Sequence, residues 1–199
     1  YPNPANPAFG TFVAARVAAL RRAGATVDVI AIRGGGVHQQ IGRKYLSLAS
    51  RVLCLAAWRA LSRRRYRVVE AHIAYPTGWV ALPAAYLHRA KLVLYAHGAD
   101  VIEIPNRSRM HRRLAASLFK RADLIVANSR FLAAEIESRF SDLPRSVVVL
   151  SPGYDPQLFH AEGAQSRQGV LFVGRLVPEK GLDVLLHALA RLHRTPPPR

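Results

Sequence analysis

Short apolar segments alternate with longer amphipathic segments along most of this 199-residue sequence. The short segments are rich in β-branched residues, as strands are, and span residues 26–32, 67–73, 91–96, 123–127 and 146–150. The longer segments have helical spacing and span residues 12–23, 41–64, 78–89, 107–121 and 130–140. Strands that are separated by helices pair in parallel through right-handed crossovers. The alternation therefore predicts an α/β fold built on a doubly wound, Rossmann-like parallel sheet.

The order of the segments also predicts how the chain divides into domains. Residues 1–150 would form a first Rossmann-like domain, whose opening loop and helix look like the part that follows a first strand. We therefore expect that strand to be missing from this sequence, ahead of residue 1. Residues 151–168 contain Pro and Gly and are weakly periodic, as an interdomain linker is. A strand over 169–174 and a helix over 181–194 would begin a second, incomplete Rossmann-like domain, residues 169–199.

The charge of the chain leaves several kinds of partner open. Lys and Arg number 29 against 12 Asp and Glu, which gives a formal net charge of +17. Nucleic acid, an anionic membrane surface or a phosphorylated substrate would suit this charge, and a compositional bias without function explains it equally well. The single cysteine, Cys54, excludes a disulfide framework and a thiolate metal cluster, and we expect it to be buried. One unpaired cysteine fits a reducing cytoplasm, and no segment has the roughly 18 apolar residues of a membrane-spanning helix.

The first candidate site is the segment Tyr95-Ala96-His97-Gly98-Ala99-Asp100, at the end of the strand over 91–96. Ligands of open parallel sheets gather beyond the carboxyl ends of the strands. His97 could exchange a proton near neutral pH, and Gly98 would let a substrate approach the main chain. The alternative is structural: His97 would hydrogen-bond within the loop and Asp100 would cap a turn.

The second candidate site is the loop from Gly174 to Gly181, which leads from the second domain's strand into its helix. Arg175 and Lys180 are two cations near a helix N-terminus, a combination suited to a diphosphate, although exposed charges on an ordinary turn are the alternative. Gly10, just before the first helix, could admit a phosphate close to the main chain, a weaker indication.

Two further patterns bear on function. The helix over 107–121 combines Arg and Lys with apolar residues, as a helix lying on anionic lipid headgroups does, while a solvated face is the alternative. His72 and His88 have no metal-ligand spacing, so we interpret both as structural and expect no metal site.

Seven short motifs, in order, resemble those of glycosyltransferase family 4, the retaining enzymes of GT-B fold. They are YP to GTFV (1–13), ALRRAGATV (19–27), VVEAH with PTG (68–78), HGAD (97–100), ADLIVANS (122–129), PGYD with Phe159 (152–159), and VGR with EKG (173–181). The turn at Pro152 departs from the family, which often has Asn there. The sequence also ends before the family's paired-glutamate segment, so we expect this stretch alone to be inactive.

The resemblance implies that the acceptor binds the first domain and a nucleotide-diphosphate sugar binds the second. Arg175, Lys180 and Gly10 would then be donor diphosphate-binding residues. His97 would be the catalytic residue, near the transferred sugar and the acceptor, with Gly98 and Asp100 in their vicinity. No cofactor and no metal would be needed.

The implied function is transfer of a sugar, with retention of configuration, in the synthesis of cell-surface polysaccharide or glycolipid. The acceptor would be a saccharide or lipid-linked, and the protein cytoplasmic, peripheral on the inner face of the membrane. One alternative is a sugar-nucleotide epimerase of GT-B fold. The other is a basic domain that binds nucleic acid or membrane without catalysis, although aromatic residues do not interleave with the Arg clusters as nucleic-acid stacking requires.

Overall fold

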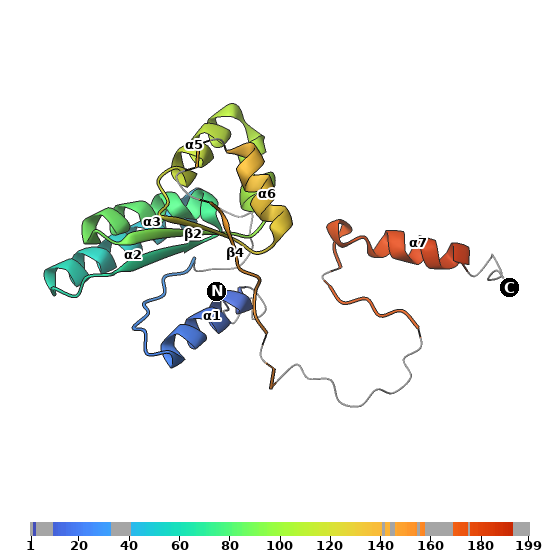
Figure 1. The fold of residues 1–199 in the computed structure, drawn as a ribbon, viewed down its shortest axis with the longest axis horizontal. Coiled ribbons are helices and arrows are strands. Elements are labelled where there is room, and N and C mark those ends of the chain that lie inside the picture. Colours follow the sequence, from blue (N-terminus) through green and yellow to red (C-terminus); the bar gives the residue numbers. More distant parts are fainter. Residues whose placement is uncertain are drawn as a thin grey trace. The chain divides into compact units, whose positions relative to one another are not determined.

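The chain folds as two separate units, Tyr1–Tyr154 and Asp155–Arg199. The structure is a computed structural model, and it describes residues 2, 10–32, 41–140, 142–143, 146–154, 156–157, 169–174 and 176–192 (Figure 1). The first unit contains the sheet, and each unit is described by itself below.

A parallel sheet of four strands forms the centre of the first unit. Its strands are β1 (Val68–His72), β2 (Lys91–Ala96), β3 (Leu124–Ala127) and β4 (Val148–Val149), hydrogen-bonded in the order β1-β2-β3-β4. The register pairs Ala71 with Leu94 and Leu94 with Ile125. Because all three neighbouring pairs are parallel, the α/β class predicted from the alternation is confirmed.

Helices connect the strands and flank the sheet. They are α1 (Thr11–Arg22), α2 (Ile41–Leu61), α3 (Ala74–His88), α4 (Ala99–Ile102), the 3₁₀ turn η1 (Pro105–Arg107), α5 (Arg109–Phe119) and α6 (Arg130–Arg139). Side-chain caps fix where two of them begin, since the hydroxyl of Ser108 accepts from the His111 N–H and that of Ser129 from the Leu132 N–H, both at 3.2 Å. The short α4 and η1 were not predicted, because a single turn is too short to show helical periodicity.

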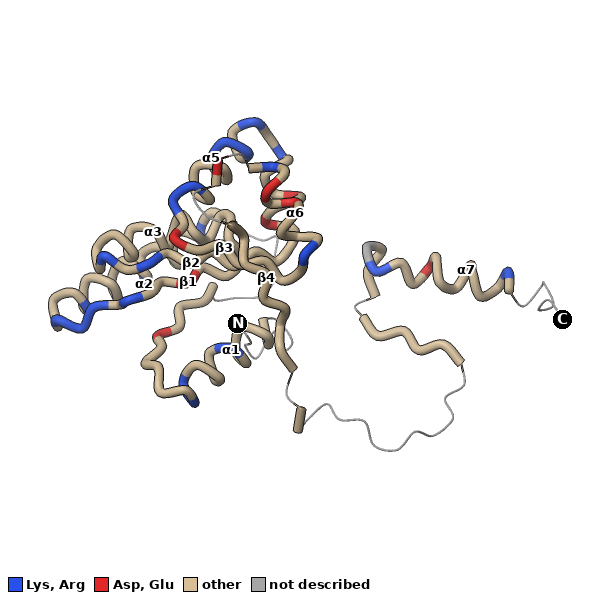
Figure 2. Tube along the Cα trace, in the orientation of Figure 1, with Lys and Arg blue, Asp and Glu red and all other residues tan. Residues whose placement is uncertain are grey.

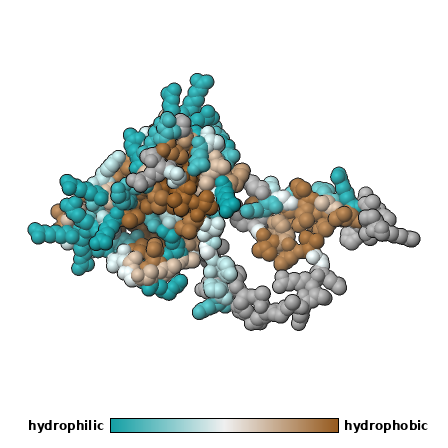
Figure 3. All heavy atoms as spheres, viewed as in Figure 1, coloured by the Kyte–Doolittle hydropathy of each residue, from teal (hydrophilic) through white to brown (hydrophobic). Residues whose placement is uncertain are grey.

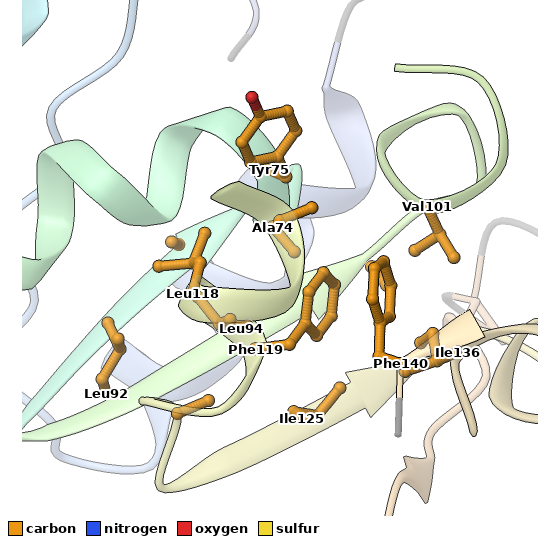
Figure 4. Close-up of a cluster of buried hydrophobic side chains, with 14 of the residues drawn as sticks. Ala74, Tyr75, Leu92, Leu94, Val101, Leu118, Phe119, Ile125, Ile136 and Phe140 are labelled. Carbon is orange, nitrogen blue, oxygen red and sulfur yellow. The ribbon is translucent and has the colours of Figure 1, made fainter. Parts of the chain in front are cut away.

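The main core lies on one face of the sheet. Successive strand residues point to opposite faces, so Leu92, Leu94 and Ile125 share this face. Helices α3, α5 and α6 pack on them, and Figure 4 shows Phe119 and Phe140 stacked in this cluster with ring centroids 4.6 Å apart. Burying these side chains supplies the main stabilisation of the unit.

The opposite face of the sheet is more polar. Glu70 and His72 of β1 share it with Val93 and Tyr95 of β2, because the register pairs Glu70 with Val93 and His72 with Tyr95. Helix α1 lies on this side, away from α5 (Figure 1), and the guanidinium of its Arg16 stands 4.6 Å from the centre of the Tyr95 ring. Helices on both faces are what a doubly wound sheet requires.

Two predicted strands are absent, and the prediction was wrong for both. Residues 26–32 and 169–174 form no strand in the described structure. A strand is stable only when its main chain pairs with a neighbour, and the four-stranded sheet includes neither segment. In the first segment, side chains bind the main chain instead: Arg21 donates to the carbonyl of Val27 at 2.7 Å and Arg51 to that of Ala31 at 2.8 Å.

Cys54 is exposed, contrary to the prediction that it is buried. It lies on α2 in a shallow hollow of about 440 Å³, lined by Val29, Ile30, Arg51, Cys54, Leu55 and Trp58. Apart from Arg51, the α2 residues around Cys54 that line the hollow are apolar, and Val29 and Ile30 line it from the segment that follows α1. None of the predicted site residues that the structure describes lines this hollow.

In the second unit, the described residues form the 3₁₀ turn η2 (Pro178–Lys180) and helix α7 (Leu182–Leu192). No residue of α7 is buried, and Figure 3 shows apolar side chains exposed along this helix. The predicted limits of the linker and of the second domain stay predictions.

Candidate active site

The predicted histidine, His97, lies at the carboxyl edge of the sheet, directly after β2. Its Nε2 is 3.3 Å from Nδ1 of His72, the last residue of β1. The ring of Phe12 in α1 also packs against that of His97, with centroids 4.8 Å apart. Burial, and to a smaller extent the nearby charge of a protonated His72, lower the pKa of His97 to about 4. His97 is therefore an uncharged imidazole at neutral pH.

His72, which we interpreted from the sequence as structural, lies beside His97 in the structure. It stacks on Tyr95, with ring centroids 4.6 Å apart, and its ring centroid is 5.5 Å from that of His97. The available signal was the alternation of β1, where Glu70 and His72 are polar residues two positions apart in an otherwise apolar strand. Such a pair points to the same face of the sheet, and the parallel register brings it beside the end of β2.

Glu70 and Arg16 form an ion pair next to His72. Arg16 donates from Nε and Nη2 to the two carboxylate oxygens of Glu70, at 3.0 and 2.8 Å, and Nε2 of His72 is 3.6 Å from Oε2. Burial would raise the pKa of Glu70, but the contacts with His72 and Arg16 outweigh burial and lower it to about 2. Glu70 is therefore a fixed negative charge beside the two histidines.

Asp100 is buried and holds the loop around His97 in place. Its Oδ1 accepts from the main-chain N–H of His97 at 2.9 Å and of Gly98 at 2.8 Å, and its Oδ2 accepts from that of Ala74 at 2.7 Å. Burial raises the pKa of Asp100 against the opposing effect of these hydrogen bonds. The carboxylate thus joins the loop after β2 to the start of α3, the structural role left open in the sequence analysis. Its predicted closeness to a bound sugar stays a prediction.

The two predicted glycines of this unit both have left-handed backbone conformations. Gly98 has φ of 123°, and a Cβ there would meet no atom within 4 Å, so the backbone rather than space requires glycine. Gly10 has φ of 68° and begins α1, with its carbonyl accepting from the N–H groups of Val13 and Ala14. Phe12 follows two residues later and contacts His97, so the start of α1 belongs to the same site.

The predicted diphosphate-binding pair lies in the second unit. Lys180 is exposed at the end of η2, and Gly181 follows it with φ of 64° just before α7. Arg175 lies outside the described residues. The structure thus brings together His97, Gly98 and Asp100, and Gly10 precedes the helix whose Phe12 contacts His97. Lys180 belongs to the separately described unit.

The cationic surface of the first unit is partly neutralised. Arg59 of α2 is bound to Asp28, at 2.6 Å, and Lys120 after α5 to Asp142, at 3.3 Å. Arg109 and Arg113 remain exposed on α5 next to the exposed Met110 and Leu114, and Figure 2 shows the Lys and Arg positions along this helix. No described helix is both long enough and apolar enough to cross a membrane.

In the part of the chain that the structure describes, no group of three or more His, Cys, Asp or Glu side chains is arranged so that it could hold a metal ion. His88, the other histidine interpreted as structural, is buried and accepts from the main-chain N–H of Tyr66 at 3.4 Å. That interpretation agrees with its place at the end of α3, away from the strand ends.

Fold and site together define a class: Rossmann-like α/β proteins whose polar groups gather at the carboxyl edge of a parallel sheet, where such proteins bind substrates. The family profile of Glycosyltransferase Family 4 matches residues 10–158. The chain therefore belongs to glycosyltransferase family 4, as its motifs indicated.

Several proteins named as glycosyltransferases are similar in sequence. The D-inositol 3-phosphate glycosyltransferase of Segniliparus rotundus is 28% identical over 149 residues, which cover 67% of this chain and 33% of that protein. The corresponding enzyme of Streptomyces bingchenggensis is 37% identical over 82 residues, covering 36% of this chain and 18% of the relative. An uncharacterized glycosyltransferase of Methanocaldococcus jannaschii is 25% identical over 124 residues, 61% of this chain and 33% of that protein. The chain thus spans about a third of the length of the Segniliparus and Methanocaldococcus proteins.

Two solved structures share the fold. They are Anabaena Alr3699/HepE in complex with UDP and glucose, with a TM-score of 0.54, and in complex with UDP-glucose, with a TM-score of 0.55. Each is 21% identical and covers 92% of this chain and 48% of the other. At this identity the likeness establishes the fold.

Proposed function

We propose that this protein is a glycosyltransferase that transfers a sugar from a nucleotide-diphosphate sugar to an acceptor with retention of configuration. The observation that carries the proposal is the position of His97 at the carboxyl edge of the sheet, inside the stretch that matches family 4. The similar enzymes named as glycosyltransferases, and the solved structures that bind UDP and glucose or UDP-glucose, support the same reaction class.

In this proposal, each predicted residue has a defined task. His97 lies near the transferred sugar and the acceptor, and Gly98 allows them to approach because it has no side chain. Gly10 lets the opening loop come close to the donor diphosphate. Arg175 and Lys180 bind that diphosphate and stabilise the negative charge of the departing nucleotide. The reaction needs neither a metal ion nor a further cofactor.

We also propose that the acceptor is lipid-linked or a saccharide and that the protein acts in the cytoplasm, on the inner face of the membrane. The exposed Arg109 and Arg113 beside Met110 and Leu114 support a contact with anionic headgroups, because cations and apolar side chains alternate on one exposed surface of α5. Synthesis of cell-surface polysaccharide or glycolipid would use such a location.

The test is a transfer assay on the gene product expressed with its complete coding sequence. UDP-glucose is the first donor, and D-inositol 3-phosphate the first acceptor, followed by a lipid-linked and a saccharide acceptor. We expect a glycosylated product that keeps the donor's anomeric configuration by NMR and forms without added metal. An inverted product, or a strict metal requirement, would contradict the proposed chemistry.

The same assay separates the alternatives. An epimerase would change the sugar of the donor in the absence of any acceptor, which the proposal excludes. A nucleic-acid-binding domain would give no product with any donor, and would bind random RNA in a salt-dependent manner but not anionic vesicles.

A further inference from the structure

The two imidazoles at the strand ends share a single hydrogen-bonding position. Nδ1 of His72 and Nε2 of His97 are 3.3 Å apart, and their rings are tilted by only 24°. A hydrogen bond there requires one nitrogen with a proton and one without. The position of the proton on one imidazole therefore depends on its position on the other.

The carboxylate of Glu70 determines which nitrogen of His72 is protonated. It lies 3.6 Å from Nε2 of His72, and Arg16 holds both of its oxygens. A carboxylate favours a proton on the nitrogen that faces it, because a bare nitrogen would direct a lone pair at a negative charge. Nε2 of His72 thus has a proton in both the neutral and the charged imidazole.

The state of His97 follows from this arrangement. When His72 is neutral, its Nδ1 is bare and accepts from His97, so His97 has its proton on Nε2 and a bare Nδ1. When His72 is charged, its Nδ1 donates to Nε2 of His97, so the proton of His97 must be on Nδ1. No described residue hydrogen-bonds Nδ1 of His97. Among the described residues, Nδ1 is therefore the ring nitrogen of His97 that has no partner in the protein and that we assign to the substrate.

We propose that Glu70 and His72 are positioning residues that set the tautomer of His97. A neutral His72 makes Nδ1 of His97 a hydrogen-bond acceptor, and a charged His72 makes it a donor. This inference rests on the proposed function and adds detail to it. When His72 is neutral, Nδ1 of His97 accepts a hydrogen bond from a hydroxyl of the sugar or the acceptor. When His72 is protonated, that hydrogen bond is lost.

Other groups around the pair hold it in place. Among the described residues, Arg16 of α1 faces Glu70, and Tyr95 of β2 stacks on His72. Asp100 of α4 binds the main chain of His97 rather than its ring. Burial raises the pKa of the Tyr95 phenol, so it stays uncharged at neutral pH. Among the described residues, Glu70 and Arg16 are therefore the charged groups that act on the His72–His97 pair.

The test measures the ring nitrogens of His97 directly, by long-range ¹H–¹⁵N NMR on the ¹⁵N-labelled chain. A His97→Gln variant assigns the signals. At high pH we expect Nε2 of His97 to be protonated and Nδ1 bare. As the pH falls and His72 becomes charged, the two nitrogens should exchange roles while His97 stays uncharged. A proton on Nδ1 at high pH, or no exchange during the titration of His72, would overturn the proposal.

Two variants extend the test. His72→Phe retains a ring on Tyr95 but has no nitrogen, so the His97 signals should lose their pH-dependent exchange. Glu70→Gln removes the charge that selects Nε2 of His72, and His97 should then show a mixture of both tautomers. His187→Phe, at an exposed position of α7, is the matched control and should leave the His97 signals unchanged. His97 signals in both site variants that match those of the control would also refute the coupling.

An activity measurement separates this inference from the proposed function. In the gene product with its complete coding sequence, His72→Phe should lower kcat about tenfold, leave the donor KM unchanged and alter the pH profile, because one hydrogen bond in the transition state is lost. If wild-type protein transfers no sugar while the NMR exchange is seen, the proposed function fails and the coupling stands. If transfer occurs and the exchange is absent, the coupling alone fails.

Discussion

Replacing Glu70 by Gln should destabilise the first unit in a pH-dependent way, because the Glu70 carboxylate is more stable in the folded chain than in the unfolded one. The pKa of Glu70 is lowered to about 2 from an ordinary value of 4.5. At about 1.36 kcal/mol per pH unit, this difference corresponds to roughly 3.4 kcal/mol. A quarter of the side chain is exposed, so solvent screening reduces the expected effect to about 2 kcal/mol.

The sign follows from the lowered pKa. A carboxyl group that ionises more readily when folded stabilises the fold above its unfolded pKa, and loses this contribution as the pH falls through its folded pKa. Wild-type protein should therefore be more stable than Glu70→Gln by about 2 kcal/mol at pH 6. The difference should shrink between pH 4.5 and pH 2, where Glu70 becomes neutral like the amide.

Urea unfolding followed by circular dichroism at a series of pH values measures this difference. Glu137→Gln, at an exposed position of α6, is the matched control and should differ from wild type by less than about 0.5 kcal/mol throughout. A stability difference for Glu70→Gln that is constant from pH 6 to pH 3, or absent at pH 6, would refute the assignment of a stabilised carboxylate.

Three further predictions concern other parts of the chain. Lys180→Ala should lower kcat for sugar transfer by about 100-fold, since a cation that stabilises the leaving nucleotide is lost; wild-type transfer by this variant would refute the diphosphate role. Gly98→Ala should lower the unfolding free energy by about 1–2 kcal/mol in thermal melts, because φ of 123° strains any L side chain, while Gly42→Ala in α2 should be neutral or stabilising. Charge reversal of both Arg109 and Arg113 to Glu should weaken sedimentation with phosphatidylserine vesicles by more than about tenfold, at about 1 kcal/mol per cation; equal binding by wild type and variant, or equal binding to neutral vesicles, would contradict the membrane contact.

Most of the sheet could be predicted from local pattern. The strands β1, β2 and β3 were found because each is a short apolar run between helices of clear periodicity. The segment 26–32 has the same composition but forms no strand, since a strand also needs a partner. The composition of a segment indicates whether it suits a strand, whereas strand pairing also requires a neighbouring strand whose main chain can hydrogen-bond with it.

The candidate site was predicted in part. His97 was found because parallel sheets place polar groups at the carboxyl ends of their strands, and Gly98 because it follows the same strand. Asp100 was named as well, but only the structure showed three main-chain N–H groups around its carboxylate. His72 was interpreted as structural because its spacing was compared with metal sites alone, and only the structure showed that it lies beside His97.

The sequence by itself determined the alternation of strands and helices, the family, and the histidine after β2, since these depend on local periodicity and on short motifs. Only the tertiary structure decided that Nδ1 of His72 and Nε2 of His97, 25 positions apart in sequence, lie within 3.3 Å of each other. It also decided that Glu70 and Arg16 form an ion pair next to His72. The physical reason is the parallel register, which sets residue 72 opposite residue 95 and so brings two strand ends to one edge. A register depends on how strands pair through their main chains, and no single segment specifies it.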